Sequence, residues 1–185
     1  MKPPRLTLNE SRARAVLARQ GSGLALDLGV PWVASLQPLP LAEAPADWAS
    51  AWTLQAEWGG ARFAIRVPEA ALTLWAESSM GAPLELNALP PELLALALEQ
   101  AWRQLAAALA PLRRGTARLA TVQPGNGTGA LPHRMAVALR RADGQAAFDA
   151  EIATDALGLL LVAGALAQRP AAASVPPADL PMPCP

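Results

Sequence analysis

A pair of adjacent glycines between two alternating runs constrains the fold of this chain more than any other feature of its sequence. In residues 48–58 the large apolar side chains fall mostly on even-numbered positions, which is the period of a strand with one buried face. Gly59 and Gly60 follow, and they supply the positive φ angles that a two-residue hairpin turn needs. Residues 62–67 then alternate again. We therefore predict a β-hairpin at residues 48–67.

A second hairpin and several helices are predicted around the first hairpin. Alternation in residues 134–140 and 147–152, with an Ala-Asp-Gly turn between them, predicts the second hairpin. Shorter strands are expected at 24–28 and 117–123. Helices are expected at 9–20 (capped by Asn9), 68–80, 92–110 and 155–168 (capped by Asp155). The predicted fold class is α+β, with two β-hairpin-plus-helix units around a long central helix.

The predicted central helix, 92–110, has a broad apolar arc and a narrow polar stripe that contains Glu99. Such a wide arc is typical of a helix that is covered on more than one side. Its predicted core residues are Leu94, Leu98, Trp102 and Leu105.

Prolines interrupt the chain between the first short strand and the first hairpin. They stand at positions 31, 38, 40 and 45, and they predict an extended connection. Trp32 and Trp48 flank this connection. We name both as candidate partner contacts, because tryptophan is enriched at the hot spots of protein interfaces. A place in the core is the alternative for each.

The composition argues against several classes of partner. Fifteen basic and fifteen acidic residues balance, so the chain lacks the overall positive field that attracts nucleic acids or anionic membranes. The longest apolar run, 156–167, is shorter than the ~20 residues of a membrane span. Cys184 is the single cysteine, which suits a reducing compartment. We expect a cytoplasmic protein that binds no nucleic acid and does not insert into membranes.

No group of residues in the sequence predicts catalysis, a cofactor site or a metal site. His133 is the single histidine, and nothing nearby marks the companions that a zinc site or a nucleophile–base pair requires, so an exposed or hydrogen-bonded structural role is expected. The glycine-rich residues 125–129 precede a strand pattern instead of the helix that a phosphate loop opens. Asp149 and Glu151 alternate on one strand face, which we interpret as solvated. We expect a protein that is not an enzyme.

The end of the chain has the composition of a linker. Residues 170–185, PAAASVPPADLPMPCP, are rich in proline and alanine and have no periodicity. We divide the chain into an N-terminal α+β interaction domain at 1–169 and a linker at 170–185. Because a linker joins two domains, we expect the natural protein to continue into a C-terminal region.

The Trp-Gly-Gly turn, the hairpin and helix around it, and the run LPPELLALALE at 89–99 resemble the N-terminal region of the SctQ family of type III secretion systems, also called HrcQ or YscQ. The resemblance implies a scaffold component of the cytoplasmic sorting platform, at the cytoplasmic face of the secretion apparatus. The implied partners are an SctK-like accessory protein and an SctL-like stator, with an indirect link to the secretion ATPase. Self-association is compatible with it. The C-terminal SpoA domains, which that family shares with flagellar switch proteins, are absent from this sequence.

Two other functions remain open. A CheC-type phosphatase-related regulatory domain would share the two-layer arrangement, but that family places an acidic residue and an asparagine three positions apart on its long helix. Here Trp102 follows Glu99 at that spacing, and an indole has no amide with which to orient an attacking water. The other alternative is an α+β protein-interaction domain that is unrelated to secretion.

Overall fold

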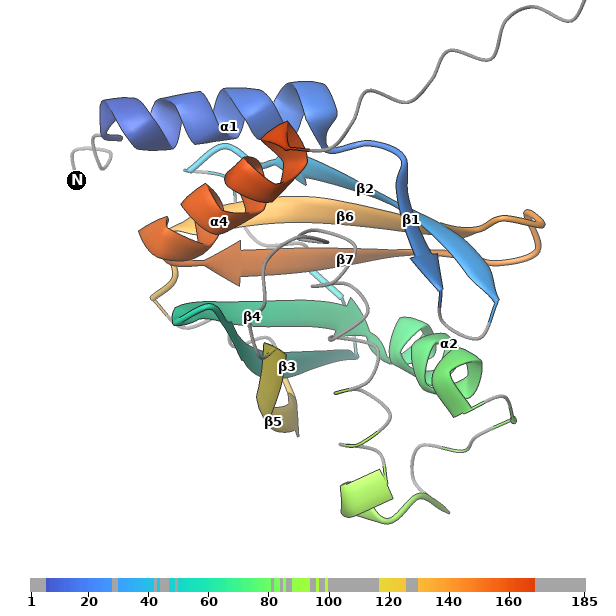
Figure 1. The fold of residues 1–185 in the computed structure, drawn as a ribbon. Coiled ribbons are helices and arrows are strands. Elements are labelled where there is room, and N and C mark those ends of the chain that lie inside the picture. Colours follow the sequence, from blue (N-terminus) through green and yellow to red (C-terminus); the bar gives the residue numbers. More distant parts are fainter. Residues whose placement is uncertain are drawn as a thin grey trace, which may run out of the picture.

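The computed structural model describes residues 6–27, 30–41, 43, 47–48, 50–80, 82–83, 85, 88–93, 96, 99, 117–125 and 130–168 (Figure 1). Its helices and strands include α1 (Leu8–Gln20), β1 (Leu24–Asp27), β2 (Pro31–Pro38), β3 (Ala51–Trp58), β4 (Ala61–Pro68), α2 (Glu69–Met80), β5 (Ala117–Pro124), β6 (His133–Arg141), β7 (Ala147–Thr154) and α4 (Ala156–Ala167).

The strands form one seven-stranded antiparallel sheet in the order β1-β2-β6-β7-β4-β3-β5. The hairpins β3–β4 and β6–β7 meet at its centre, where Ile65 of β4 lies opposite Ile152 of β7. The strand before each hairpin pairs with the other hairpin: β2 lies beside β6, and β5 lies beside β3. Each hairpin is therefore flanked in the sheet by the strand that precedes the other hairpin in the sequence.

Both predicted hairpins are confirmed. Gly59 and Gly60 connect β3 to β4 with φ angles of 58° and 81°, and Trp58 pairs with Ala61 across the turn. In the second hairpin, Gly144 has a φ angle of 75°, again in the region that favours glycine. Each hairpin leads directly into a helix, α2 or α4, so the predicted hairpin-plus-helix units are present.

The described core lies between the sheet and a layer formed by α1 and α4 (Figure 1). Strand residues that alternate along β2, β4, β6 and β7 point into this core. They include Trp32, Ala34, Leu36, Phe63, Ile65, Met135, Val137 and Ile152. The helices contribute Ala13 and Leu17 from α1, and Leu159, Val162 and Leu166 from α4. Every described helix is too short or too polar to span a membrane.

The structure corrects the prediction that residues 31–45 form only an extended connection, because β2 is a full strand. Its side chains alternate between buried and exposed, and it pairs with β1 on one side and with β6 on the other. Pro31 and Pro38 are its first and last residues. Proline is tolerated at a strand end, where a missing N–H removes no interior rung of the ladder.

The first helix is capped by Thr7, and the prediction of Asn9 as its cap is wrong. The Thr7 hydroxyl accepts a hydrogen bond from the Glu10 N–H, and the Glu10 carboxylate accepts one from the Thr7 N–H. This reciprocal pair is a capping box, which satisfies two N–H groups that a bare helix end would leave unpaired. The predicted end of the helix at Gly21 is confirmed.

Several sequence predictions lie largely outside the described residues. They concern most of the helix at 92–110 with its core residues Leu94, Leu98, Trp102 and Leu105, and the linker at 170–185. Of the helix, the described residues 92, 93, 96 and 99 are helical. The domain boundary at residue 169 stays a prediction.

Candidate partner-binding surface

Trp32 is a core residue, and the prediction that it is an exposed partner contact is wrong. Its side chain is 1% exposed. Its ring meets that of Phe148 edge-on, with centroids 5.5 Å apart and planes at 61°. Edge-to-face geometry of this kind is favourable for aromatic pairs. The indole faces the core because it alternates with Val33 and Ser35 along β2. A partner would reach Trp32 only if the strand opened.

Trp48 is half-buried and lies against a charged side chain. The guanidinium of Arg66 sits 4.8 Å from the centroid of the Trp48 ring, within the range of a cation–π contact. Arg66 is fully buried. Trp48 therefore helps to cover a buried cation on the strand β4. A contact between Trp48 and a partner stays a prediction.

Arg66 belongs to a buried ion cluster that spans three strands. Glu151 of β7 lies 3.6 Å from Arg66 Nη1 through Oε2, and 3.1 Å from Arg134 Nη1 through Oε1. The side chains of these residues are at most 9% exposed. One carboxylate thus lies between two guanidinium groups. The prediction of a solvated strand face is confirmed for Asp149, which is exposed, but it is wrong for Glu151. Glu151 is buried against Arg66 of β4 and Arg134 of β6, and the alternation of residues within β7 gives no information about which strands lie beside it.

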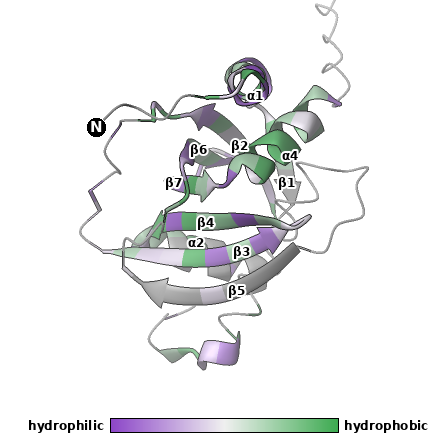
Figure 2. Ribbon diagram, turned by 90° about the vertical axis from the view of Figure 1, so that its left-hand side faces the viewer, coloured by the Kyte–Doolittle hydropathy of each residue, from purple (hydrophilic) through white to green (hydrophobic). Residues whose placement is uncertain are grey.

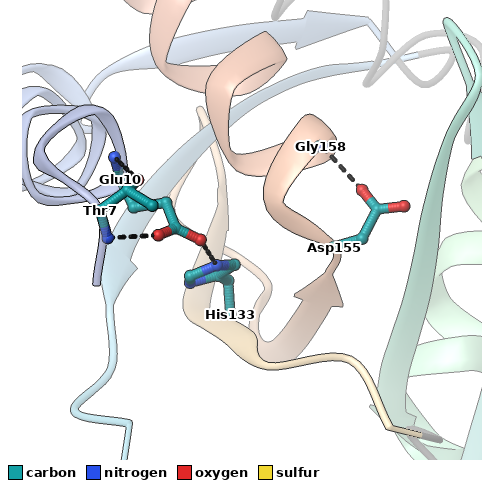
Figure 3. Close-up of polar contacts among 5 residues, drawn as sticks. All are labelled: Thr7, Glu10, His133, Asp155 and Gly158. Carbon is teal, nitrogen blue, oxygen red and sulfur yellow. Dashed lines mark hydrogen bonds and ion pairs between the residues drawn. The ribbon is translucent and has the colours of Figure 1, made fainter. Parts of the chain in front are cut away.

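A second polar cluster joins α1 to the sheet (Figure 3). The Glu10 carboxylate lies 3.0 Å from His133 Nε2, and its other oxygen accepts the Thr7 N–H at 2.6 Å. These hydrogen bonds from the backbone and the side chain of Thr7, with a smaller effect of His133, hold the pKa of Glu10 below its ordinary value of 4.5. His133 is buried at the first residue of β6. Both oxygens of the carboxylate are engaged in holding two elements together.

Asp155 makes similar use of both carboxylate oxygens at the start of α4. Its Oδ1 accepts the Gly158 N–H at 2.8 Å, as a helix cap does (Figure 3). Its Oδ2 accepts the Arg62 N–H at 3.2 Å and lies 3.8 Å from Arg62 Nε. The predicted cap at Asp155 is confirmed. This residue fixes α4 against the beginning of β4.

The helix α4 is mostly hydrophobic along its length in Figure 2, whereas α1 beside it includes hydrophilic residues. None of the twelve residues of α4 is charged. Leu157 and Leu160 are 46% and 40% exposed. The sequence predicts a buried helix here; the structure confirms the helix but leaves this face open. We take it as the candidate partner-binding surface.

Metal chemistry has no visible support in the described part of the chain. No three His, Cys, Asp or Glu side chains come together there in a way that could hold a metal ion.

No protein-family profile matches the chain, and no curated protein sequence matches it. Solved structures do. FliY of Thermotoga maritima is 13% identical, with 88% of this chain and 98% of that chain covered and a TM-score of 0.53. The FliM middle domain of H. pylori is 12% identical over 86% of this chain and 99% of that one, with a TM-score of 0.46. The chemotaxis protein CheX of Desulfovibrio desulfuricans is 15% identical over 80% and 97%, with a TM-score of 0.39.

The similarity to FliY concerns the fold, since identity this low carries no residue roles. It extends over most of both chains, so the α+β arrangement of the whole described unit is shared. The predicted fold class is thereby confirmed.

Proposed function

We propose that this chain is a non-enzymatic scaffold domain of the cytoplasmic sorting platform of a bacterial type III secretion system, where it binds other platform proteins. The observation that carries the proposal is the shared fold with FliY over 88% of the chain. FliY and FliM are flagellar switch proteins, and the SctQ family, which residues 89–99 resemble, shares its SpoA domains with that class. The fold and the sequence resemblance thus point in one direction from independent observations.

The use of the buried charges supports a scaffold. Glu10 joins α1 to β6, Glu151 joins β7 to β4 and β6, and Asp155 joins α4 to β4. Each carboxylate has both oxygens occupied by partners within the fold. A general acid or base would instead keep one oxygen available to a substrate. The exposed apolar face of α4 suits the contacts that a scaffold makes.

The partners that the proposal names are an SctK-like accessory protein and an SctL-like stator. The chain should therefore be co-expressed with each of them from its own secretion cluster, and the products separated by size exclusion with light scattering. We expect a stable complex with the SctK-like protein. Because the SctL-like protein is expected to contact mainly the SpoA region, the same experiment is repeated with that region co-expressed.

The outcome that contradicts the proposal is a well-folded chain that binds neither protein in either arrangement. A separate assay addresses the CheC-type alternative. Incubation with a phosphorylated response regulator should leave the rate of dephosphorylation unchanged. An acceleration that Glu99→Ala abolishes would replace the scaffold proposal with a phosphatase.

A further inference from the structure

The exposed side of α4 is a continuous apolar stripe. Leu159, Val162 and Leu166 point into the core and are at most 1% exposed. Leu157 and Leu160, three positions apart, lie together on the other side, where they are 46% and 40% exposed. Exposed apolar area is unfavourable in water in proportion to its extent. A helix with apolar residues on both sides therefore gains from a second covering layer.

The neighbours of α4 give this stripe a definite shape. On one side lies α1, and on the other lies the β3–β4 turn, where a Cβ placed on Gly59 would be 3.1 Å from Leu161 Cδ1. One turn beyond Leu160, a Cβ placed on Gly164 would meet nothing within 4 Å. The stripe thus consists of the side chains of Leu157 and Leu160, followed one turn later by Gly164, where the helix surface has no side chain. Small residues of this kind allow the backbone of another helix to come close.

The exposed charged residues of α1, the helix that packs beside α4, are both positive: Arg12 and Arg19. At the β3–β4 turn the charges balance, because Arg62 lies opposite the exposed Glu57 and forms an ion pair with Asp155. Glu10, at the start of α1, already accepts hydrogen bonds within the fold. Asp149 and Glu151 of β7 alternate with the core residue Ile152 and so point to the opposite face of the sheet.

A second copy of this chain fits that surface poorly. In a two-fold symmetric contact the same patch occurs on both sides, so the arginines of one copy would approach the arginines of the other. Like charges brought together at an interface oppose binding. A partner with carboxylates around an apolar stripe has the complementary arrangement.

We propose that the exposed face of α4 binds an amphipathic helix of a partner protein, whose apolar stripe lies on Leu157, Leu160 and Gly164 and whose acidic side chains, on the side toward α1, meet Arg12 and Arg19. This deepens the proposed function and rests on it for the class of ligand, a protein. In helix-on-helix docking of this type, the bound helix makes its contacts through apolar residues at positions i, i+3, i+4 and i+7.

The test uses two synthetic helical peptides with one leucine stripe, flanked by glutamates in the first and by lysines in the second. Binding of each labelled peptide to the full chain is followed by fluorescence anisotropy. We expect the glutamate peptide to bind at least roughly tenfold more tightly, since like-charge contacts at an interface cost that much or more. Reversing charge with Arg12→Glu and Arg19→Glu together should reverse the preference.

The apolar contribution is tested with Leu160→Gln. We expect it to weaken the glutamate peptide by roughly tenfold or more, because a buried leucine typically contributes at least that factor. Val33→Thr is the matched control, since Val33 is a 39% exposed apolar residue on β2 that alternates with the core-facing Trp32. It should leave binding unchanged. Equal binding of both peptides, or binding that Leu160→Gln does not affect, overturns the proposal.

Other occupants of the face give distinct results, and each overturns the proposal. If light scattering shows a dimer that Leu160→Gln dissociates, a second copy covers α4. A complex with the SctK-like protein that tolerates Leu160→Gln, together with no peptide binding, refutes this surface and leaves the scaffold function standing.

Discussion

Glu10 and His133 are separated by 123 positions in the sequence, and yet their side chains meet at 3.0 Å, which joins the first turn of α1 to the first residue of β6. Glu10 also completes the capping box with Thr7. One carboxylate thus both starts a helix and docks it on the sheet (Figure 3). Its loss should affect the stability of the fold in a way that depends on pH.

We predict that Glu10→Gln lowers the free energy of unfolding near neutral pH by about 1–2 kcal/mol, as expected for a charged hydrogen bond replaced by a neutral one. The pKa of Glu10 is lower in the folded chain than its ordinary value of 4.5. A carboxyl of this kind adds stability that is present above its unfolded pKa and is lost as the pH falls through the folded value. Wild type should therefore lose this increment below about pH 4.5, and the two proteins should converge.

Urea unfolding at a series of pH values measures this convergence. Glu43→Gln is the control, because Glu43 is exposed in the connection after β2. It should leave the curve of stability against pH in place. A constant difference between wild type and Glu10→Gln down to the acid limit would show that the charge of Glu10 is not what matters.

Two glycines of α4 predict opposite effects of the same substitution. A Cβ on Gly158 would lie 1.7 Å from Thr154 Oγ1 and 3.0 Å from Phe63 Cζ, whereas a Cβ on Gly164 would meet nothing within 4 Å. Gly158→Ala should therefore destabilise the fold by about 1–3 kcal/mol or more through overpacking. Gly164→Ala should stabilise it by up to about 1 kcal/mol, because alanine is the better helix former.

Thermal or urea unfolding of the two variants gives the comparison directly. The helix, the substitution and the expected change in helix propensity are the same, so the difference reports the packing around Gly158. If both variants gained stability, α4 would have to lie farther from Thr154 than the structure places it.

Glu151 is predicted to be essential to the centre of the sheet. Glu151→Gln removes a negative charge that lies between Arg66 and Arg134, and both guanidinium groups stay buried. Removing one member of a buried ion pair typically costs about 3–5 kcal/mol, because the charge that stays buried loses the attraction of the removed group. Asp149→Asn, on the same strand but exposed, should change stability by less than about 0.5 kcal/mol. Comparable effects of the two changes in urea unfolding would refute a structural role for the cluster.

The hairpins were predictable because their information is local. Alternation and the Gly59–Gly60 pair specify the first hairpin without reference to the rest of the chain. The strand β2 was not predicted, since its prolines suggested an irregular segment. They stand only at its two ends, and the alternation of Trp32, Ala34 and Leu36 between them was the available signal. The Thr7–Glu10 capping box was also readable, at the spacing that such boxes have.

The polar clusters could not be predicted, because each draws on several distant elements. Arg66, Arg134 and Glu151 meet only when β4, β6 and β7 are adjacent, and the order of the strands follows from the whole sheet. The open side of α4 is hidden for a related reason. The apolar sequence of α4 predicts a buried helix, but it does not show whether a further element of the fold covers the side of the helix that faces away from the sheet.

A final prediction compares the stability lost when Trp32, in the core, and Trp48, which is half-buried, are each replaced by alanine. Trp32→Ala should lower the free energy of unfolding by about 3–5 kcal/mol, as for other buried aromatic residues, while Trp32→Phe keeps most of the contact with Phe148 and should cost less. Trp48→Ala should cost less than Trp32→Ala, because Trp48 is half-buried and covers Arg66 from one side. Urea unfolding followed by circular dichroism measures all three.

The same variants address the remaining candidate contact. If Trp48 also touches a partner, Trp48→Ala should weaken the complex with the SctK-like protein by more than Trp32→Phe does, at a temperature where both variants are fully folded. Equal affinities would restrict Trp48 to its place over Arg66. A Trp32→Ala variant as stable as wild type would contradict the packing of β2 itself, because an indole that is 1% exposed cannot be removed from a close-packed core without leaving a cavity.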